Sequence, residues 1–136
     1  MLSPKIKKEN TKKVRFLILT AFHKRAHISE IYWLGIERLK ERFNIETLAI
    51  VSDPENKELA CGNSDHVLET TNEPHGQKMN QAMAHAVTFE FDLLMQLGSD
   101  DLITNRGIEK CIDMLSRGHL FFGFNRLLIY NSQNGQ

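Results

Sequence analysis

The sequence predicts an α/β protein, a three-layer α/β/α sandwich in which helices cover both faces of a mostly parallel sheet. Short apolar runs typical of buried strands alternate along the chain with segments whose apolar residues recur every three or four positions. Such alternation builds βαβ units, whose crossovers are almost always right-handed. The strands are therefore expected to lie parallel between two layers of helices.

The first half of the chain supplies three strands and one helix. Val14–Thr20 is a continuous apolar run and is predicted to be a buried strand. His27–Phe43 is predicted to be an amphipathic helix. Ile45–Ser52 is the second predicted strand, ended by Asp53-Pro54, and His66–Glu69 is a short third. The residues expected to face the core from the helix are Ile28, Ile31, Gly35, Leu39 and Phe43.

The second half continues the alternation after a polar loop at Thr71–Gly76. Gln77–Thr88 is predicted to be a helix, Phe91–Leu97 a fourth strand, and Leu120–Tyr130 further strand. A third helix is expected from an N-cap at Asn105 to Gly118. The side chains expected to point inward from these two helices are Met79, Ala82, Met83 and Ala86, and then Ile108, Cys111, Ile112 and Leu115.

Length and composition indicate one soluble domain. The 136 residues are 41% hydrophobic and 25% charged, and no apolar run is long enough to cross a bilayer. Residues 14–130 are expected to form the domain, and 131–136 a polar tail. Met1–Lys13 carries five lysines and one glutamate, so a basic disordered leader is expected; an arm that touches an acidic membrane or nucleic acid is the alternative.

Other features narrow the class of partner and the compartment. No basic stripe interleaved with aromatic residues follows the leader, so nucleic acid is not an expected partner. Cys61 and Cys111 are far apart and form no CxxC pattern, which argues against a structural zinc site and a disulfide scaffold. A reduced, cytoplasmic protein is therefore expected.

Four stretches are expected to meet at one edge of the sheet. In open parallel sheets, ligands bind at the carboxyl ends of the strands, where the strand order reverses. That rule selects Thr20–Arg25, Asp53, Thr70–Lys78 and Gly98–Asp101. The first of these has no G-x-G-x-x-G and no Walker glycines, which disfavours a standard dinucleotide fold and a P-loop enzyme.

The strongest candidate site is Asp100-Asp101. Two adjacent carboxylates after a buried strand can hold a hard cation such as Mg²⁺ or Mn²⁺, with ligand phosphates completing the shell. The alternative is that one of them caps the following turn. Asp53 has a similar alternative, because Asp-Pro commonly starts a turn.

The order of these motifs resembles family 2-type glycosyltransferases of the GT-A fold. Phe91–Ile103 resembles their strand and acidic motif, Asn72–Met83 their loop and helix, and Ile50–Asp53 their second strand ending in Asp. The likeness runs from about Val14 to Gly118. The usual motif is Asp-x-Asp, whereas its leading acid is replaced here by Gly98, which puts the ribose contact in doubt more than the metal contact.

The resemblance implies a Rossmann-like domain that binds a nucleotide-diphosphate sugar for transfer to an acceptor, a glycan or lipid carrier that the sequence does not identify. It implies a role for several residues: nucleotide contacts from the loop that holds Ala21, His23 and Arg25, base or ribose recognition by Asp53, a place near the donor for Lys78 and Asn80, and ribose and metal-diphosphate binding by Asp100 and Asp101. Homo-oligomer formation is left open.

The resemblance also implies an acceptor half after the acidic motif, yet only 35 residues follow Asp101. We therefore expect a truncated chain, a gene remnant or a minimal domain completed by a partner, which transfers sugar poorly or not at all by itself. Two alternatives remain: a nucleotidyltransferase-like enzyme that makes nucleotide sugars, for which Ala21–Arg25 has the basic residues but lacks the glycines, and a non-catalytic nucleotide-binding or interaction domain.

Overall fold

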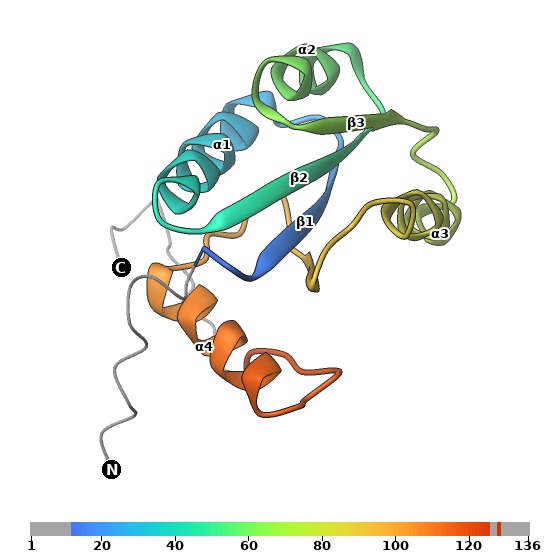
Figure 1. Cartoon of the computed structure of the whole chain (residues 1–136). Coiled ribbons are helices and arrows are strands. Elements are labelled where there is room, and N and C mark those ends of the chain that lie inside the picture. The colour runs from blue at the N-terminus through green and yellow to red at the C-terminus, as the bar shows by residue number, and fades with distance from the viewer. Residues whose placement is uncertain (1–11, 126–127, 129–136) are drawn as a thin grey trace.

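Four parallel strands form one sheet in the part of the chain that the structure describes. The computed structural model describes residues 12–125 and 128 (Figure 1). The strands are β1 (Arg15–Phe22), β2 (Asn44–Val51), β3 (His66–Glu69) and β4 (Leu93–Gln96). They lie in the order β3-β2-β1-β4, and every neighbouring pair is parallel.

Helices cover both faces of this sheet. Figure 1 shows α1 (Ala26–Lys40) and α2 (Pro54–Asn63) on one face and α3 (His75–Ala86) on the other. The last helix, α4 (Asn105–Ser116), joins the α1 side, because its Ile108, Cys111 and Ile112 belong to the same buried cluster as the α1 side chains. The predicted three-layer α/β/α architecture is therefore confirmed.

Alternation along the strands divides the core in two. Phe16 and Ile18 of β1 point toward α1 and α4, whereas Leu17 and Leu19 point toward α3. Met79 and Met83 of α3 pack against the second cluster, and Ala82 and Ala86 are fully buried in it. The inward face predicted for this helix is thus confirmed.

An aromatic cluster supports the carboxyl end of β1. Phe22, the last residue of the strand, stacks on Trp33 with ring centroids 5.2 Å apart and meets Tyr32 edge to face at the same distance. The Tyr32 hydroxyl pairs with the Thr20 hydroxyl at 2.7 Å inside the core, so its polar tip is satisfied. Burial accordingly raises the pKa of Tyr32. The connection from β1 to α1 therefore starts on a rigid base.

The buried face of α1 differs from the predicted one. The buried side chains of the helix are Ser29, Tyr32, Trp33, Ile36 and Leu39, whereas Ile31, expected to face inward, is 53% exposed. Two apolar stripes share this helix at similar spacing, and the stripe that carries the two large aromatic rings removes more apolar surface from water. Gly35 instead lies against Leu102, whose Cδ2 atom a Cβ at this position would meet at 2.7 Å.

Helix α2 was not predicted. The Asp53-Pro54 pair expected only to end the second strand also begins this helix: Asp53 is the N-cap and accepts the Asn56 backbone N–H at 3.0 Å, and Pro54 is the first helical residue. Only Asn56 and Ala60 of the helix are buried, so its apolar periodicity is weak. The capping pair was the one clear sign of it.

The segment after β4 also differs in part. Thr104, not Asn105, caps α4 and accepts the Gly107 N–H at 3.1 Å. Residues 120–125 and 128 form no strand, contrary to expectation, and Leu120 and Phe121 are 97% and 96% exposed, so no neighbouring strand covers them. The rest of the expected strand, the polar tail and residues 1–11 of the expected leader lie outside the described residues. In the part of the chain that is described, no helix is both long and apolar enough to cross a membrane.

Candidate functional site

The strand order reverses between β1 and β4. The chain runs outward from β1 through β2 to β3, then returns on the α3 side to add β4 at the other flank of β1. The carboxyl ends of β1 and β4 therefore flank a topological switch point, where open α/β sheets bind ligands. Arg25, after β1, and Asp100, after β4, meet here: Nη1 of Arg25 lies 3.3 Å from Oδ2 of Asp100, and both side chains are about half exposed.

The connection from β1 to α1 holds a strained backbone. Lys24 and Arg25 have φ angles of 56° and 52°, in the left-handed region that glycine favours. Each such residue costs about 1–2 kcal/mol in a non-glycine chain, so surrounding contacts must hold it. Asp53 accepts the Lys24 N–H at 2.8 Å, and the Asn56 amide donates to the Lys24 carbonyl at 2.9 Å. The start of α2 thus fixes the loop after β1.

Asp53 is fully engaged inside the protein. Besides the N–H groups of Lys24 and Asn56, its carboxylate accepts the Asn56 side-chain amide, at 2.9 Å on Oδ2. Nδ1 of His23 lies 3.9 Å from the same oxygen and has no hydrogen-bond partner among the described residues. Partial burial would raise the pKa of Asp53, but the hydrogen bonds from Asn56 and Lys24 and the nearby His23 outweigh it and lower that pKa.

Gly98–Asp101 forms a tight turn directly after β4. Oδ2 of Asp101 accepts the Gly98 N–H at 3.2 Å, and the Asp101 N–H donates to the Gly98 carbonyl at 3.1 Å. A Cβ on residue 98 would meet that same carboxylate oxygen at 2.5 Å. This contact gives a physical reason for the glycine where the resembled motif has an acid. Asp101 thus caps the turn that it ends, not the following turn, which was the alternative left open from the sequence.

The two carboxylates have the chemistry that a hard cation requires, with room for further ligands. One oxygen of Asp100 faces Arg25 and one of Asp101 faces Gly98, while the other oxygen of each accepts no hydrogen bond from the residues that the structure describes. Within those residues, no three His, Cys, Asp or Glu side chains gather as a metal site. Two carboxylates do not enclose a cation by themselves, so a hard cation such as Mg²⁺ or Mn²⁺ could be held here only if oxygen atoms of a ligand completed its shell.

The remaining predicted residues divide into inner and outer ones. Lys78 is 2% exposed, and its ammonium lies beneath the edge, where it donates to three acceptors. Ala21 is a β1 residue that packs toward the α3 side of the core. Asn80 is exposed on α3. The structure therefore brings five of the predicted residues to the carboxyl edge of the sheet: His23, Arg25, Asp53, Lys78 and Asp100. Asn80 lies instead on the exposed surface of α3.

Two residues that sequence reasoning missed complete the edge. Asn56 joins Asp53, the Lys24 carbonyl and the Ser29 hydroxyl, which it meets at 2.7 Å. Ser52 accepts from Lys78 at 2.5 Å. The position of Asn56 three residues after a capping Asp could have marked it, because that residue lies beside the N-cap side chain. No sequence signal marks Ser52.

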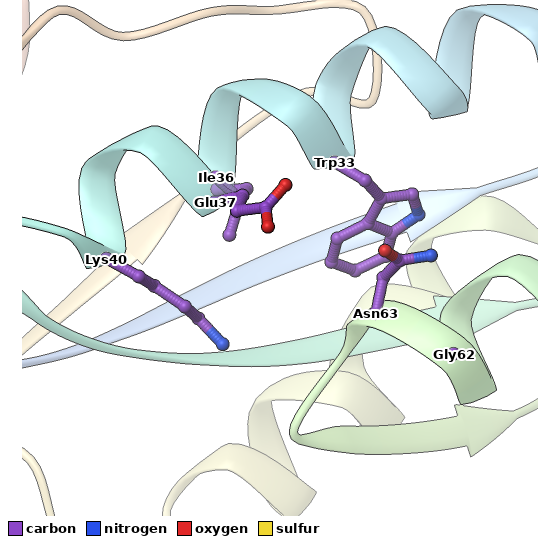
Figure 2. Close-up of a pocket in the computed structure, with 6 residues that line it drawn as sticks. All are labelled: Trp33, Ile36, Glu37, Lys40, Gly62 and Asn63. Atoms are coloured by element: carbon purple, nitrogen blue, oxygen red, sulfur yellow. The ribbon is translucent and has the colours of Figure 1, made fainter.

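A pocket lies away from this edge, between α1 and α2. Figure 2 shows its lining: Trp33, Ile36, Glu37 and Lys40 from α1, with Gly62 and Asn63 from α2. The volume of the pocket is about 190 Å³. Lys40 and Asn63 are the last residues of their helices, so the pocket opens toward the amino edge of the sheet. It holds none of the residues predicted to bind a ligand.

Comparison with known proteins adds no relative. No family model, no curated protein and no solved structure matches the chain. What this edge does must be argued from its own geometry.

Proposed function

We propose that the chain binds a nucleotide-diphosphate sugar at the carboxyl edge of β1, β2 and β4, with a divalent cation held by Asp100 and Asp101, as a glycosyltransferase-like donor-binding domain. The observation that carries the proposal is the meeting of Arg25 and Asp100 at the switch point, 3.3 Å apart. A basic and an acidic group from different strand ends converge where ligands of such sheets bind.

Charge explains why a cation is part of the proposal. A diphosphate is an anion, and this edge carries three carboxylates, those of Asp53, Asp100 and Asp101. Lys24 and Arg25 offset part of this charge, but without a cation the carboxylates of Asp100 and Asp101 would still repel the ligand. Asp100 and Asp101 would hold Mg²⁺ or Mn²⁺, whose charge would offset this repulsion and would stabilise a leaving diphosphate electrostatically.

The protein residues have distinct parts in this proposal. Asp100 and Asp101 hold the cation through their open oxygens, and Arg25 offers its guanidinium to a phosphate. His23 lies in the same loop, with its Nδ1 toward Asp53, and would contact the nucleotide only as the resemblance implies. Asp53 keeps that loop in shape and, as the resemblance implies, stands near the base or ribose. Transfer to an acceptor would need groups beyond those gathered at this edge.

Calorimetric titration of the full chain tests the proposal. The ligands are a panel of nucleoside diphosphates and triphosphates, each with Mn²⁺ and with a chelator. We expect a diphosphate to bind with Mn²⁺ and to bind at least about tenfold more weakly with the chelator, since a charge-assisted contact contributes about 1.5–3 kcal/mol. Preference for triphosphates would favour a nucleotidyltransferase-like activity instead. Absence of binding across the panel would refute the nucleotide site.

A further inference from the structure

Lys78 joins three connections at the carboxyl edge. Its Nζ donates to the Phe22 carbonyl at the end of β1 (3.0 Å), to the Ser52 hydroxyl just after β2 (2.5 Å), and to the Asn72 side-chain carbonyl between β3 and α3 (3.2 Å). The side chain comes from the first turns of α3, on the opposite face of the sheet from α1. One ammonium group thus links three segments that are 30 and 20 residues apart in sequence.

The ammonium has no donor left for a ligand. It carries three N–H groups, and each has an acceptor inside the protein. All three acceptors are neutral. Burial lowers the pKa of Lys78, and the charge of Asp53 acts against that effect.

Such an arrangement is costly for a purely structural role. A buried charge without a contacting counter-ion is less favourable than an apolar side chain of the same length. Its partners adjoin the residues of the proposed site: Phe22 precedes His23, and Ser52 precedes Asp53. The three hydrogen bonds of the Lys78 ammonium, here called the tether, therefore act on the two loops that carry His23 and Asp53.

We infer that Lys78 is a positioning residue, which fixes the loops after β1, β2 and β3 relative to one another and so preorganises the edge for a nucleotide without contacting it. This inference rests on the proposed function, because it concerns the same ligand. The resemblance implies only a place near the donor for this lysine, whereas the inference gives it a role in positioning the loops. Lys78 forms no hydrogen bond with the segment after β4, and Asp100 meets the tethered loop only through its half-exposed ion pair with Arg25, so we expect cation binding by Asp100 and Asp101 to depend little on the tether.

The test compares Lys78→Met with a matched core variant. The control is chosen from Ile112→Val and Ile112→Ala, at a buried α4 position remote from the three loops, so that its urea midpoint matches that of Lys78→Met. Affinity is measured for the nucleoside diphosphate that binds best and for its nucleoside, each with and without Mn²⁺. Preorganisation predicts that Lys78→Met weakens both ligands by a similar factor, about tenfold, and leaves the Mn²⁺ dependence unchanged. The control should bind as the wild type does.

Two results would overturn the inference. Wild-type affinity in Lys78→Met would do so, and so would a loss confined to the diphosphate, which would indicate direct contact with phosphate. If Lys78→Met does not fold, Ser52→Ala and Asn72→Ala each remove one acceptor and should weaken both ligands by smaller, similar factors; unchanged affinity in both would again refute the tether.

Hydrogen exchange separates this inference from the proposed function. If the wild type binds no nucleotide, the proposed function fails, but the tether is still tested. Amide exchange at residues 22–25, 52–53 and 70–73 should then be faster in Lys78→Met than in the matched control. Equal exchange in the two variants would refute the tether by itself.

Discussion

The carboxylate of Asp53 accepts the backbone N–H of Lys24 at 2.8 Å, so the residue that begins α2 also fixes the loop after β1. Lys24 and Arg25 occupy left-handed backbone conformations there. One side chain therefore serves a helix cap and a strained loop at once. This double use connects the stability of the domain with the shape of its candidate site.

Replacing Asp53 by Ala should destabilise the protein by about 1–2 kcal/mol at pH 7, the usual cost of a lost N-cap, with the unpaired Lys24 N–H adding to it. The pKa of Asp53 is lowered in the folded state. Its contribution is therefore complete above the unfolded pKa of about 3.9 and is lost as the pH falls through the folded value. Urea unfolding of both proteins at several pH values should show free energies of unfolding that differ most at pH 7 and approach each other as the pH falls below the unfolded pKa of about 3.9. A constant difference across this range would contradict the ionic part of the role.

Asp53→Ala should also weaken binding of a nucleoside diphosphate, by about 1.5–3 kcal/mol if the carboxylate accepts a hydrogen bond from the base or ribose. Because both of its oxygens already accept internal hydrogen bonds, loss of loop shape contributes to this effect. Calorimetry at pH 7 measures it. Asn56→Ala is the informative companion: it removes the Lys24 carbonyl contact and leaves the carboxylate, so only the loop-shape part should be lost. Unchanged affinity in Asp53→Ala would remove Asp53 from the site.

Replacing Asp100 by Asn should weaken diphosphate binding and remove most of its dependence on Mn²⁺ together, because one anionic oxygen donor of the cation pair is lost. Titrations with Mn²⁺ and with chelator give the ratio of affinities. Asp92→Asn is a matched control, since Asp92 forms an ion pair with Arg15 at the amino edge of the sheet (Nη2 to Oδ1, 3.1 Å). The control should retain the wild-type ratio. If Asp100→Asn retains it too, Asp100 does not bind the cation.

Gly98→Ala should impair cation binding by Asp100 and Asp101 without changing either carboxylate group. The added methyl would meet Oδ2 of Asp101 at 2.5 Å and force that side chain away from the Gly98 N–H. We expect the Mn²⁺-dependent affinity to fall several-fold and stability to change by about 1 kcal/mol. Gly62→Ala, in α2, meets nothing within 4 Å and should stabilise the helix by roughly 0.5–1 kcal/mol with no effect on binding. A Gly98→Ala protein that binds as tightly as the wild type would show that the position of Asp101 is unimportant.

The strands could be predicted from the sequence because each is a short apolar run with a clear end. His66–Glu69 was placed to the residue, and β1, β2 and β4 to within two residues at each end. Helix α1 was predicted but its face was not, because Ile31 and Ile36 lie on competing stripes and the areas of Tyr32 and Trp33 decide between them. Periodicity alone does not weigh side-chain size.

For the candidate site, the sequence could predict which loops meet at the carboxyl edge of the sheet, but not which atoms their side chains contact. Strand ends identify which loops converge, so Arg25, Asp53 and Asp100 were found. What each side chain contacts depends on tertiary geometry: the three acceptors of Lys78 come from loops up to 56 residues away in sequence. The hydrogen bond from the Gly98 N–H to the Asp101 carboxylate likewise depends on the turn after β4, which a sequence of four residues does not determine.

Arg25 offers a way to separate loop strain from ligand binding. Its φ of 52° costs about 1–2 kcal/mol, and glycine removes that cost but adds about 0.5–1 kcal/mol of chain entropy to folding. The half-exposed ion pair with Asp100 contributes at most about 1 kcal/mol. Both variants lose the ion pair, but only glycine relieves the strained backbone. Arg25→Gly should therefore be more stable than Arg25→Ala, by about 0.5 kcal/mol. Urea unfolding of the two variants measures this difference.

Diphosphate affinity should behave differently in the same pair of variants. Both remove the guanidinium at the switch point, so both should bind the diphosphate more weakly than the wild type by a similar factor, and the difference should shrink as salt is raised. A nucleoside without phosphates should bind equally to all three proteins.

If Arg25→Gly is clearly less stable than Arg25→Ala, the left-handed backbone is not a source of strain. If both variants bind the diphosphate as the wild type does, the guanidinium does not face a phosphate, and the meeting of Arg25 with Asp100 is an ordinary surface ion pair.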